Sequence, residues 1–237
     1  MTTNEHPGAE LAERLGAVQG RLAAAAGAAG RPAPRLLAVS KTQCAGAVRA
    51  AHAAGQRAFG ENYVQEGVEK IAALADLRAA LEWHCIGPLQ SNKTRPVAEH
   101  FDWVQSVDRL KLAERLSAQR PDDRAPLNVC LQVNIDGSPS KSGVPPQEAR
   151  ALAEAVHSLP RLRLRGLMTI PDPAPDGGPP HEAHRRARAL FDELVAAGLP
   201  LDTLSMGMSD DLDAAVAAGS TMVRVGSAIF GARPARG

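Results

Sequence analysis

The sequence predicts a single (β/α)8 TIM-type barrel with an extra N-terminal helix. Eight short runs of strand-forming residues alternate with helical patterns along the 237 residues, which is typical of parallel βαβ units. Several of these runs are almost continuously apolar, as strands buried on both faces are. An open doubly wound sheet is the alternative, but no GxGxxG fingerprint follows the first run. Eight units in one chain of this length most simply close into a barrel.

The first element is an amphipathic helix. Apolar residues recur at the spacing of one helical face from Leu11 to Leu22, so we expect a helix over about residues 8–29. Gly30 and Pro32 then end it. We therefore divide the chain into residues 1–30, a helix that packs on the barrel, and residues 31–237, the barrel itself.

The eight predicted strands are separated by helices with clear boundary signals. Glycines stand where helices should end, and the pair Pro145-Pro146 stands where one should begin. The Pro- and Gly-rich segment from Pro171 to His181 is predicted to be a loop. The helix-ending glycines are Gly55, Gly198 and Gly219, and the strands are expected to begin near Arg35, Arg57, Glu82, Phe101, Leu127, Leu162, Leu201 and Thr221.

Composition excludes several classes of partner. Lys and Arg number 27 against 26 Asp and Glu, so the net charge of +1 favours neither nucleic acid nor an anionic membrane. The N-terminus lacks the basic and apolar regions of a signal peptide, and no apolar run approaches the roughly 20 residues that span a bilayer. The three cysteines are far apart and suggest neither a metal finger nor a disulfide framework. The cytoplasm is the expected compartment.

Polar and chargeable residues collect at the predicted C-terminal ends of the strands, where barrel active sites lie. The strand segments that precede them are mostly apolar, so these side chains should meet at one rim. With the residues beside them they are Ser40-Lys41, Glu61-Asn62, His84 with Gly87, Gln105-Ser106, Asn134, Met168-Thr169, Ser205 and Arg224-Val225-Gly226-Ser227.

Lys41 is the central candidate. It follows the strand segment LLAVS, just inside the barrel, where a charged amine is costly to bury. A neutral amine is the nucleophile that Schiff-base chemistry requires. The alternative is a lysine whose ammonium group reaches solvent at the rim.

The last two units predict a phosphate site, because barrels commonly bind phosphate after strands seven and eight. Ser209 is expected to cap a helix that has Asp210 and Asp211 in its first turn. Gly226 allows close approach of the backbone, and Ser227 can donate from its hydroxyl and its amide. Two ordinary capped turns are the alternative.

Three further residues have two interpretations each. Arg224 could contact a ligand or form an ion pair. His84 could line a site or be a hydrogen-bonded core histidine, and Asn62 could line a site or cap the next helix. No two histidines have metal-ligand spacing, and neither a Ser-His-Asp nor an HExxH pattern is visible, so we predict no metal.

Seven segments of the chain occur in a characteristic order, namely AVSKTQ, FGENYVQE, WHCIGPLQSNKTR, VQSVDR, LQVNIDGSPSKSGV, RGLMTI and LSMGMSDDLDAAVAAGSTMVRVGSAIFGAR. With these segments the chain resembles the pyridoxal phosphate homeostasis protein family, from about Arg35 to Arg233. The resemblance implies a barrel like that of alanine racemase, with pyridoxal 5′-phosphate held as a Schiff base on Lys41. It further implies Ser205, Ser209, Gly226 and Ser227 around the phosphate, Arg224 near the pyridine nitrogen, Asn62 and His84 lining the pocket, and Asn134 at its edge.

Such a site favours a binding protein over an enzyme. Arginine stays protonated, so Arg224 would keep the pyridine nitrogen unprotonated and weaken the ring as an electron sink. The chain also has a single tyrosine, Tyr63, inside FGENYVQE, whereas alanine racemase uses a tyrosine from a second domain of a partner subunit. We therefore expect a monomer that stores, protects or delivers the cofactor to apo-enzymes, without robust catalysis or a catalytic residue. A racemase-like enzyme of low activity is the alternative, and a barrel that binds another phosphate ligand noncovalently is the third.

Overall fold

Eight parallel strands close into one barrel in the computed structural model, which describes residues 7–173 and 180–231. Each strand pairs with the next along the chain, and the last pairs with the first. The predicted fold class, a (β/α)8 barrel with an added N-terminal helix, is confirmed. The strands are β1 (Arg35–Val39), β2 (Ala58–Glu61), β3 (Glu82–Cys85), β4 (Trp103–Val107), β5 (Leu127–Gln132), β6 (Leu162–Met168), β7 (Thr203–Ser205) and β8 (Met222–Val225).

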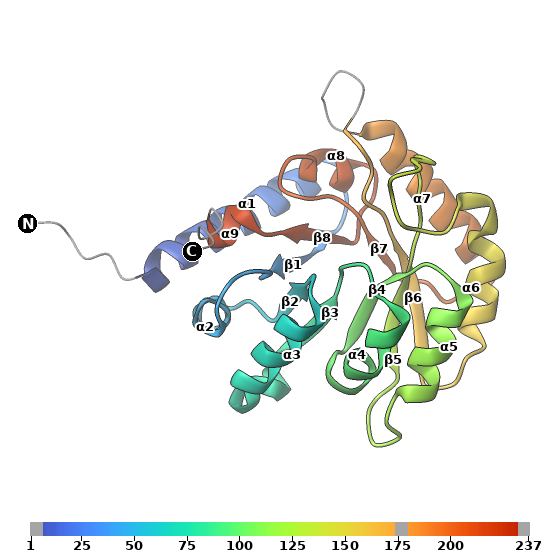
Figure 1. Ribbon diagram of the computed structural model, residues 1–237. Coiled ribbons are helices and arrows are strands. Elements are labelled where there is room, and N and C mark those ends of the chain that lie inside the picture. The colour runs from blue at the N-terminus through green and yellow to red at the C-terminus, as the bar shows by residue number, and fades with distance from the viewer. Residues whose placement is uncertain (1–6, 174–179, 232–237) are drawn as a thin grey trace, which may run out of the picture.

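Helices connect the strands and surround the barrel (Figure 1). Gly55, Gly198 and Gly219 follow three of them with φ of 102°, 93° and 97°, the left-handed conformation that ends a helix at glycine. The α-helices are α1 (Pro7–Ala28), α2 (Ala45–Ala53), α3 (Val64–Ala73), α4 (Thr94–His100), α5 (Leu110–Gln119), α6 (Ala149–His157), α7 (His181–Ala196), α8 (Leu212–Ala217) and α9 (Ser227–Phe230). Three 3-10 turns, η1 (Ala75–Ala80), η2 (Ser91–Lys93) and η3 (Pro146–Glu148), complete the described elements.

The N-terminal helix α1 packs against α2, α8 and α9, so the first and last helices of the described chain lie side by side (Figure 1). Its apolar stripe, from Leu11 to Leu22, is buried. This contact brings α1 close to the two units in which the sequence predicts a phosphate site.

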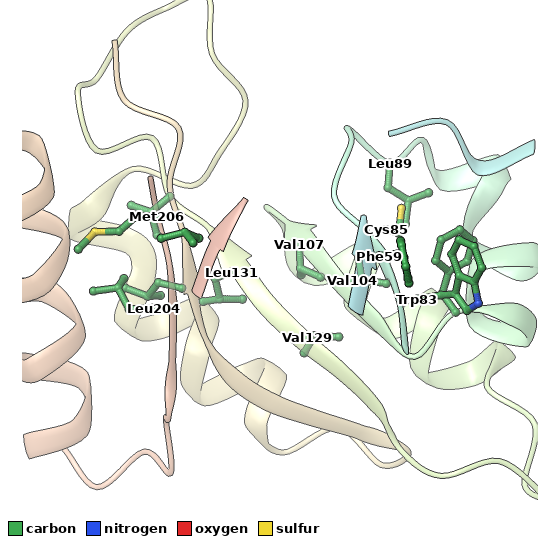
Figure 2. Close-up of a cluster of buried hydrophobic side chains, with 14 of the residues drawn as sticks. Phe59, Trp83, Cys85, Leu89, Val104, Val107, Val129, Leu131, Leu204 and Met206 are labelled. Atoms are coloured by element: carbon green, nitrogen blue, oxygen red, sulfur yellow. The ribbon is translucent and has the colours of Figure 1, made fainter. Parts of the chain in front are cut away.

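The main hydrophobic core lies between the outer face of the barrel and the helices. Figure 2 shows part of it, with Phe59 and Trp83 from neighbouring strands among the labelled side chains. Their rings lie 5.8 Å apart between centroids. The set of side chains packed inside the barrel is smaller than this core and more polar. There the rings of His84 and Trp103 stack with their centroids 5.0 Å apart. The helices are therefore held by apolar burial, whereas the barrel interior can carry hydrogen bonds.

Strand β6 has one more residue than its neighbour β5 at a local bulge. Leu164 pairs with Val129, but the next residue of β5, Cys130, pairs with Gly166. Beyond the bulge, Met168 joins the interior cluster, although Leu164 faces the helices. Gly166 is required there, because a Cβ would lie 1.7 Å from a carbonyl oxygen of β7.

Candidate functional site

A cavity of about 370 Å³ lies at the C-terminal ends of the strands. Its wall has an apolar part, which includes Val39, Ile86 and Ile170, and a polar part. Six of the residues predicted from the sequence line it, namely Lys41, Asn62, Ser209, Arg224, Gly226 and Ser227. The structure therefore brings together residues that are up to 186 positions apart (41 and 227) in the chain.

Lys41 reaches the cavity because the chain leaves β1 in an unusual way. The Ser40 amide still donates to the Gly60 carbonyl at 3.0 Å, so strand pairing continues to the residue before the lysine. Thr42 then adopts a φ of 65°, which is rare for a β-branched residue. Lys41 is half-buried between these two fixed points and lines the cavity.

A buried ionic cluster lies behind this turn. Lys70 of α3 lies 2.8 Å from Glu61 and 2.5 Å from Glu66, and Glu66 accepts the amide of Thr42 at 2.5 Å. Burial raises the pKa of Glu61, and the nearby Lys70 opposes that rise. The cluster thus attaches α3 to the backbone on either side of Lys41.

Arg224 extends from β8 into the cavity and is almost fully buried. Its guanidinium donates to the Ser205 hydroxyl and to the Thr169 carbonyl, both at 2.8 Å. No carboxylate within the described ranges lies at ion-pair distance, so Arg224 does not form the ion pair that was one of its two interpretations. Burial lowers the pKa of Arg224 to about 10, which leaves the group charged at neutral pH.

The expected helix cap at Ser209 is wrong. Helix α8 begins at Leu212, so Ser209 and Asp210 form the turn before it, and Asp211 stands at the cap position without a side-chain cap bond. Asp210 and Asp211 are therefore not in the first helical turn. Several adjacent Ser and Asp residues can each serve as a cap, and the spacing alone chose the wrong one.

Asp211 instead holds the backbone of the turn that precedes α8. Its carboxylate accepts the Met208 amide at 2.6 Å and lies 2.9 Å from Nε2 of the buried His184 on α7. Burial alone would raise the pKa of Asp211, but these hydrogen bonds outweigh burial and lower it. Arg21 of α1 holds the other side of the turn by donating to the Ser209 carbonyl at 2.7 Å.

Two glycines allow the loops around the cavity to approach each other. A Cβ at Gly226 would lie 3.2 Å from the Val39 carbonyl oxygen, and one at Gly87 would lie 2.1 Å from the Asn62 carbonyl oxygen. Asn62 is not the cap of α3, because Tyr63 occupies that position. Asn62 therefore lines the cavity, with its backbone held against Gly87.

Three predicted residues do not line this cavity within the described ranges. The amide of Asn134 donates to the Ser138 carbonyl at 2.8 Å and so stabilises its own turn. His84 and Ser205 are fully buried inside the barrel, below the cavity. His84 is thus a hydrogen-bonded core histidine in this structure, which was one of its two interpretations.

Sequence reasoning missed some of the residues that shape the site. Ile170, Met208 and Phe230 line the cavity without an obvious signal, because isolated apolar residues in loops are common. Lys70 was missed because its position in the sequence is typical of a surface residue. It follows Glu66 by four residues on a helix, a spacing that usually marks an exposed pair.

No group of three or more His, Cys, Asp or Glu side chains is placed to hold a metal ion in the described ranges. Nor does any described helix combine the length and apolar character needed to cross a bilayer.

Comparison with known proteins finds relatives that match along most of the chain. The family model for the N-terminal domain of alanine racemase matches residues 14–234. A pyridoxal phosphate homeostasis protein from Pseudomonas aeruginosa is 61% identical over 225 residues, covering 94% of this chain and 96% of that protein. The Escherichia coli K12 protein of the same name is 54% identical over 227 residues, with 94% and 97% covered.

A solved structure supports the same assignment. PipY of Synechococcus elongatus, solved with PLP bound, superposes with a TM-score of 0.80 at 42% identity, covering 93% of this chain and 99% of PipY. The resemblance expected from the sequence motifs is thereby confirmed. The chain belongs to the family of pyridoxal phosphate homeostasis proteins.

Proposed function

We propose that this protein binds pyridoxal 5′-phosphate in the cavity, with Lys41 as its covalent anchor, and serves the homeostasis of that cofactor. The observation that carries the proposal is the placement of Lys41 and Arg224 in one cavity with the hydroxyl-bearing Ser209 and Ser227. The names of its relatives and the PLP-bound PipY structure support the same ligand.

The residues present suit this ligand chemically. A cavity of about 370 Å³ is within the range of small-molecule sites. The apolar wall at Val39, Ile86 and Ile170 suits the face of an aromatic ring. Asp210 also lines the cavity, and its carboxylate disfavours a phosphate beside it. We therefore place the phosphate toward Gly226 and Ser227.

Each polar residue would have a separate role. The amine of Lys41 would attack the aldehyde carbon, and formation of the carbon–nitrogen double bond would release one water molecule. Arg224 has only N–H donors at neutral pH, so it would donate to the pyridine nitrogen and leave that nitrogen unprotonated. When bound, the cofactor supplies a reactive aldehyde and an electron-accepting ring.

This arrangement favours a carrier that stores or protects the aldehyde and delivers it to apo-enzymes. The only tyrosine, Tyr63, is half-exposed and does not line the cavity, so it is not positioned as a second acid or base opposite Lys41. The reversibility of the bond to Lys41 would permit transfer. A racemase-like activity would need Lys41 to act as a single base.

Reduction of the covalent bond tests the anchor directly. Protein incubated with pyridoxal phosphate is treated with borohydride, and the modified lysine is found by peptide mass spectrometry. We expect modification of Lys41 in the wild type, none at this site in Lys41→Ala, and wild-type behaviour in Lys111→Ala, which changes an exposed lysine on α5. A protein that binds the cofactor but is never fixed at Lys41 would favour the noncovalent alternative.

Hydrogen exchange separates a carrier from an enzyme. The loaded protein is incubated with L-amino acids in deuterated water, and loss of the α-proton signal is followed by NMR. A carrier is expected to leave the signal intact and to activate an added apo-enzyme by cofactor transfer. Rapid exchange would contradict the carrier proposal and support the racemase-like alternative.

We further propose that the protein acts as a monomer in the cytoplasm. Its three cysteines, Cys44, Cys85 and Cys130, are all free thiols, which suits a reducing compartment. Burial raises the pKa of Cys85 and of Cys130 to about 12, so these two thiols resist oxidation. Sedimentation equilibrium of the loaded protein should give the mass of one chain.

A further inference from the structure

Arg224 is the upper end of a chain of hydrogen bonds that runs through the inside of the barrel. Below it, the Ser205 hydroxyl lies 2.6 Å from Oε1 of Gln105 on β4. Nε2 of Gln105 lies 2.9 Å from Nδ1 of His84, and Nε2 of His84 lies 2.7 Å from the carboxylate of Glu82. Four consecutive hydrogen bonds therefore connect the cavity to the opposite end of the barrel.

All four hydrogen bonds of this chain are donated in the same direction, from Arg224 toward Glu82. Arg224 can only donate, so Ser205 accepts from it and directs its own proton to Gln105. With its oxygen occupied, the Gln105 amide presents N–H to His84, which must accept at Nδ1 and carry its proton at Nε2. That proton points to Glu82, which accepts.

Charge and burial agree with this direction. Burial is the main cause that lowers the pKa of His84, and a neutral ring is the form that can accept at Nδ1. Ser205, Gln105 and His84 are fully buried, so water does not replace the bonds between these three residues. Glu82 is half-buried at the end of the chain, where Arg35 also contacts it at 2.8 Å.

The charge of Asp211 acts on the buried guanidinium from beyond ion-pair distance, whereas the hydrogen-bond chain that begins at Arg224 ends at the carboxylate of Glu82. No carboxylate within the described ranges pairs with Arg224 directly, and every intervening group is neutral. Hydrogen bonds in such a chain polarise one another in a low-dielectric interior. Each link orients the next, so the position of the Arg224 guanidinium depends on residues that do not line the cavity.

We propose that Glu82, His84, Gln105 and Ser205 are positioning residues, which hold the Arg224 guanidinium in the orientation that meets the ring nitrogen of the ligand. This proposal rests on the proposed function of the cavity. It gives His84 and Ser205 a role without ligand contact. It gives the same kind of role to Gln105, which the sequence placed only among the rim residues, and to Glu82, for which the sequence suggested none.

Two variants and one matched control test the proposal. Gln105→Met keeps the volume but breaks the chain, and Glu82→Gln removes its terminal charge. Asp202→Asn removes another carboxylate at the same end of the barrel, where it pairs with Arg165 outside the chain. The measurements are the dissociation constant for pyridoxal phosphate and the visible absorption spectrum of the loaded protein.

We expect Gln105→Met to weaken binding by about 10-fold, the effect of losing the two hydrogen bonds that Gln105 makes with the neutral groups of Ser205 and His84, and to shift the visible spectrum. Glu82→Gln should also weaken binding and shift the visible spectrum, but by smaller amounts. Asp202→Asn should stay within about twofold of the wild type. A Gln105→Met protein with wild-type affinity and spectrum would overturn the proposal. If that variant does not fold, Glu82→Gln, at the accessible end, decides in the same way.

A second measurement needs no ligand. In protein labelled with [15N]histidine, the ring nitrogens of His84 should report a neutral imidazole with its proton at Nε2 at pH 7. A doubly protonated ring, or a proton at Nδ1, would overturn the proposed direction. If the wild type failed to bind pyridoxal phosphate, the proposed function would fail, whereas this measurement would still test the chain.

Discussion

The ammonium nitrogen of Lys70 lies 2.6 Å from the carbonyl oxygen of Ser40, the residue that precedes Lys41. The Lys70 side chain is 6% exposed and also contacts Glu61 and Glu66. A buried ammonium that satisfies three acceptors is well compensated, but its removal leaves all three without their partner. One lysine of α3 thus fixes the backbone from which another lysine reaches the cavity.

Lys70→Met should therefore destabilise the protein strongly. We expect the free energy of unfolding to fall by about 3 kcal/mol, because two carboxylates lose their buried counter-charge. Urea denaturation would measure this change. Arg150→Met, which breaks the exposed pair with Glu154 on α6, should cost less than about 0.5 kcal/mol. Equal effects of the two substitutions would contradict a special role for the cluster.

Thr42→Gly should separate stability from binding. The φ of 65° at Thr42 is strained for a β-branched residue, and glycine adopts it freely. Relief of strain, less the entropic cost of glycine, should raise the free energy of unfolding by about 1 kcal/mol. The freer turn should bind pyridoxal phosphate more weakly by titration. A variant that is less stable than the wild type would show that Thr42 is not strained.

Arg21→Met should weaken cofactor binding from outside the cavity. Arg21 holds the Ser209 carbonyl and also pairs with Asp213. Loss of the hold on the turn should raise the dissociation constant for pyridoxal phosphate about fivefold, as one lost hydrogen bond would. Asp213→Asn removes the ion pair but keeps the contact to Ser209, so it serves as the control. If both variants bound equally well, α1 would have no part in shaping the site.

Glu82 and Glu61 should affect the pH dependence of stability in opposite directions. Burial alone would raise the pKa of Glu82, but His84 and Arg35 outweigh it and lower the pKa from 4.5 to about 2. Ionised Glu82 therefore stabilises the fold above pH 4.5, and this contribution is lost as the pH falls toward about 2. The stability difference between wild type and Glu82→Gln should shrink over that range.

For Glu61 the sign is reversed. Its pKa is raised in the folded state, mainly by burial, so the folded protein binds this proton more tightly than the unfolded chain. Its contribution to stability should decrease as the pH rises above 4.5. Relative to Glu61→Gln, the wild type should thus lose stability with rising pH. Urea denaturation at a series of pH values would show the two opposite trends, and parallel trends would contradict the assignment.

The sequence was sufficient to predict the barrel because its signals repeat. The strands are short, and several of them are almost continuously apolar. Several of the helices between them have glycine or proline at a boundary, such as Gly55 or Pro145. An error in one unit would not change the fold class. The rim followed from the fold, because the carboxyl ends of all parallel strands face the same way. Lys41, Asn62 and Arg224 were found by this rule.

The remaining features depend on contacts between distant residues. The prediction that Ser209 caps α8 was wrong because the position of Asp211 depends on His184, which contacts Asp211 from another helix. The role of Lys70 likewise depends on α3 lying against the turn after β1. Neither contact can be predicted from the spacing of nearby residues in the sequence.

The bulge in β6 acts as a phase shift in the alternation of side chains along that strand. Downstream of Gly166, each side chain points to the face opposite to the one that it would have in a strand without the bulge. With this alternation, Ile170 is part of the cavity wall. If the strand instead ran through Arg165 without the bulge, strict alternation would turn the Thr169 side chain toward the cavity in place of the Ile170 aliphatic surface. The chemical character of one wall of the pocket is thus encoded by a residue count in the middle of the barrel, not only by the identity of the residue at the wall.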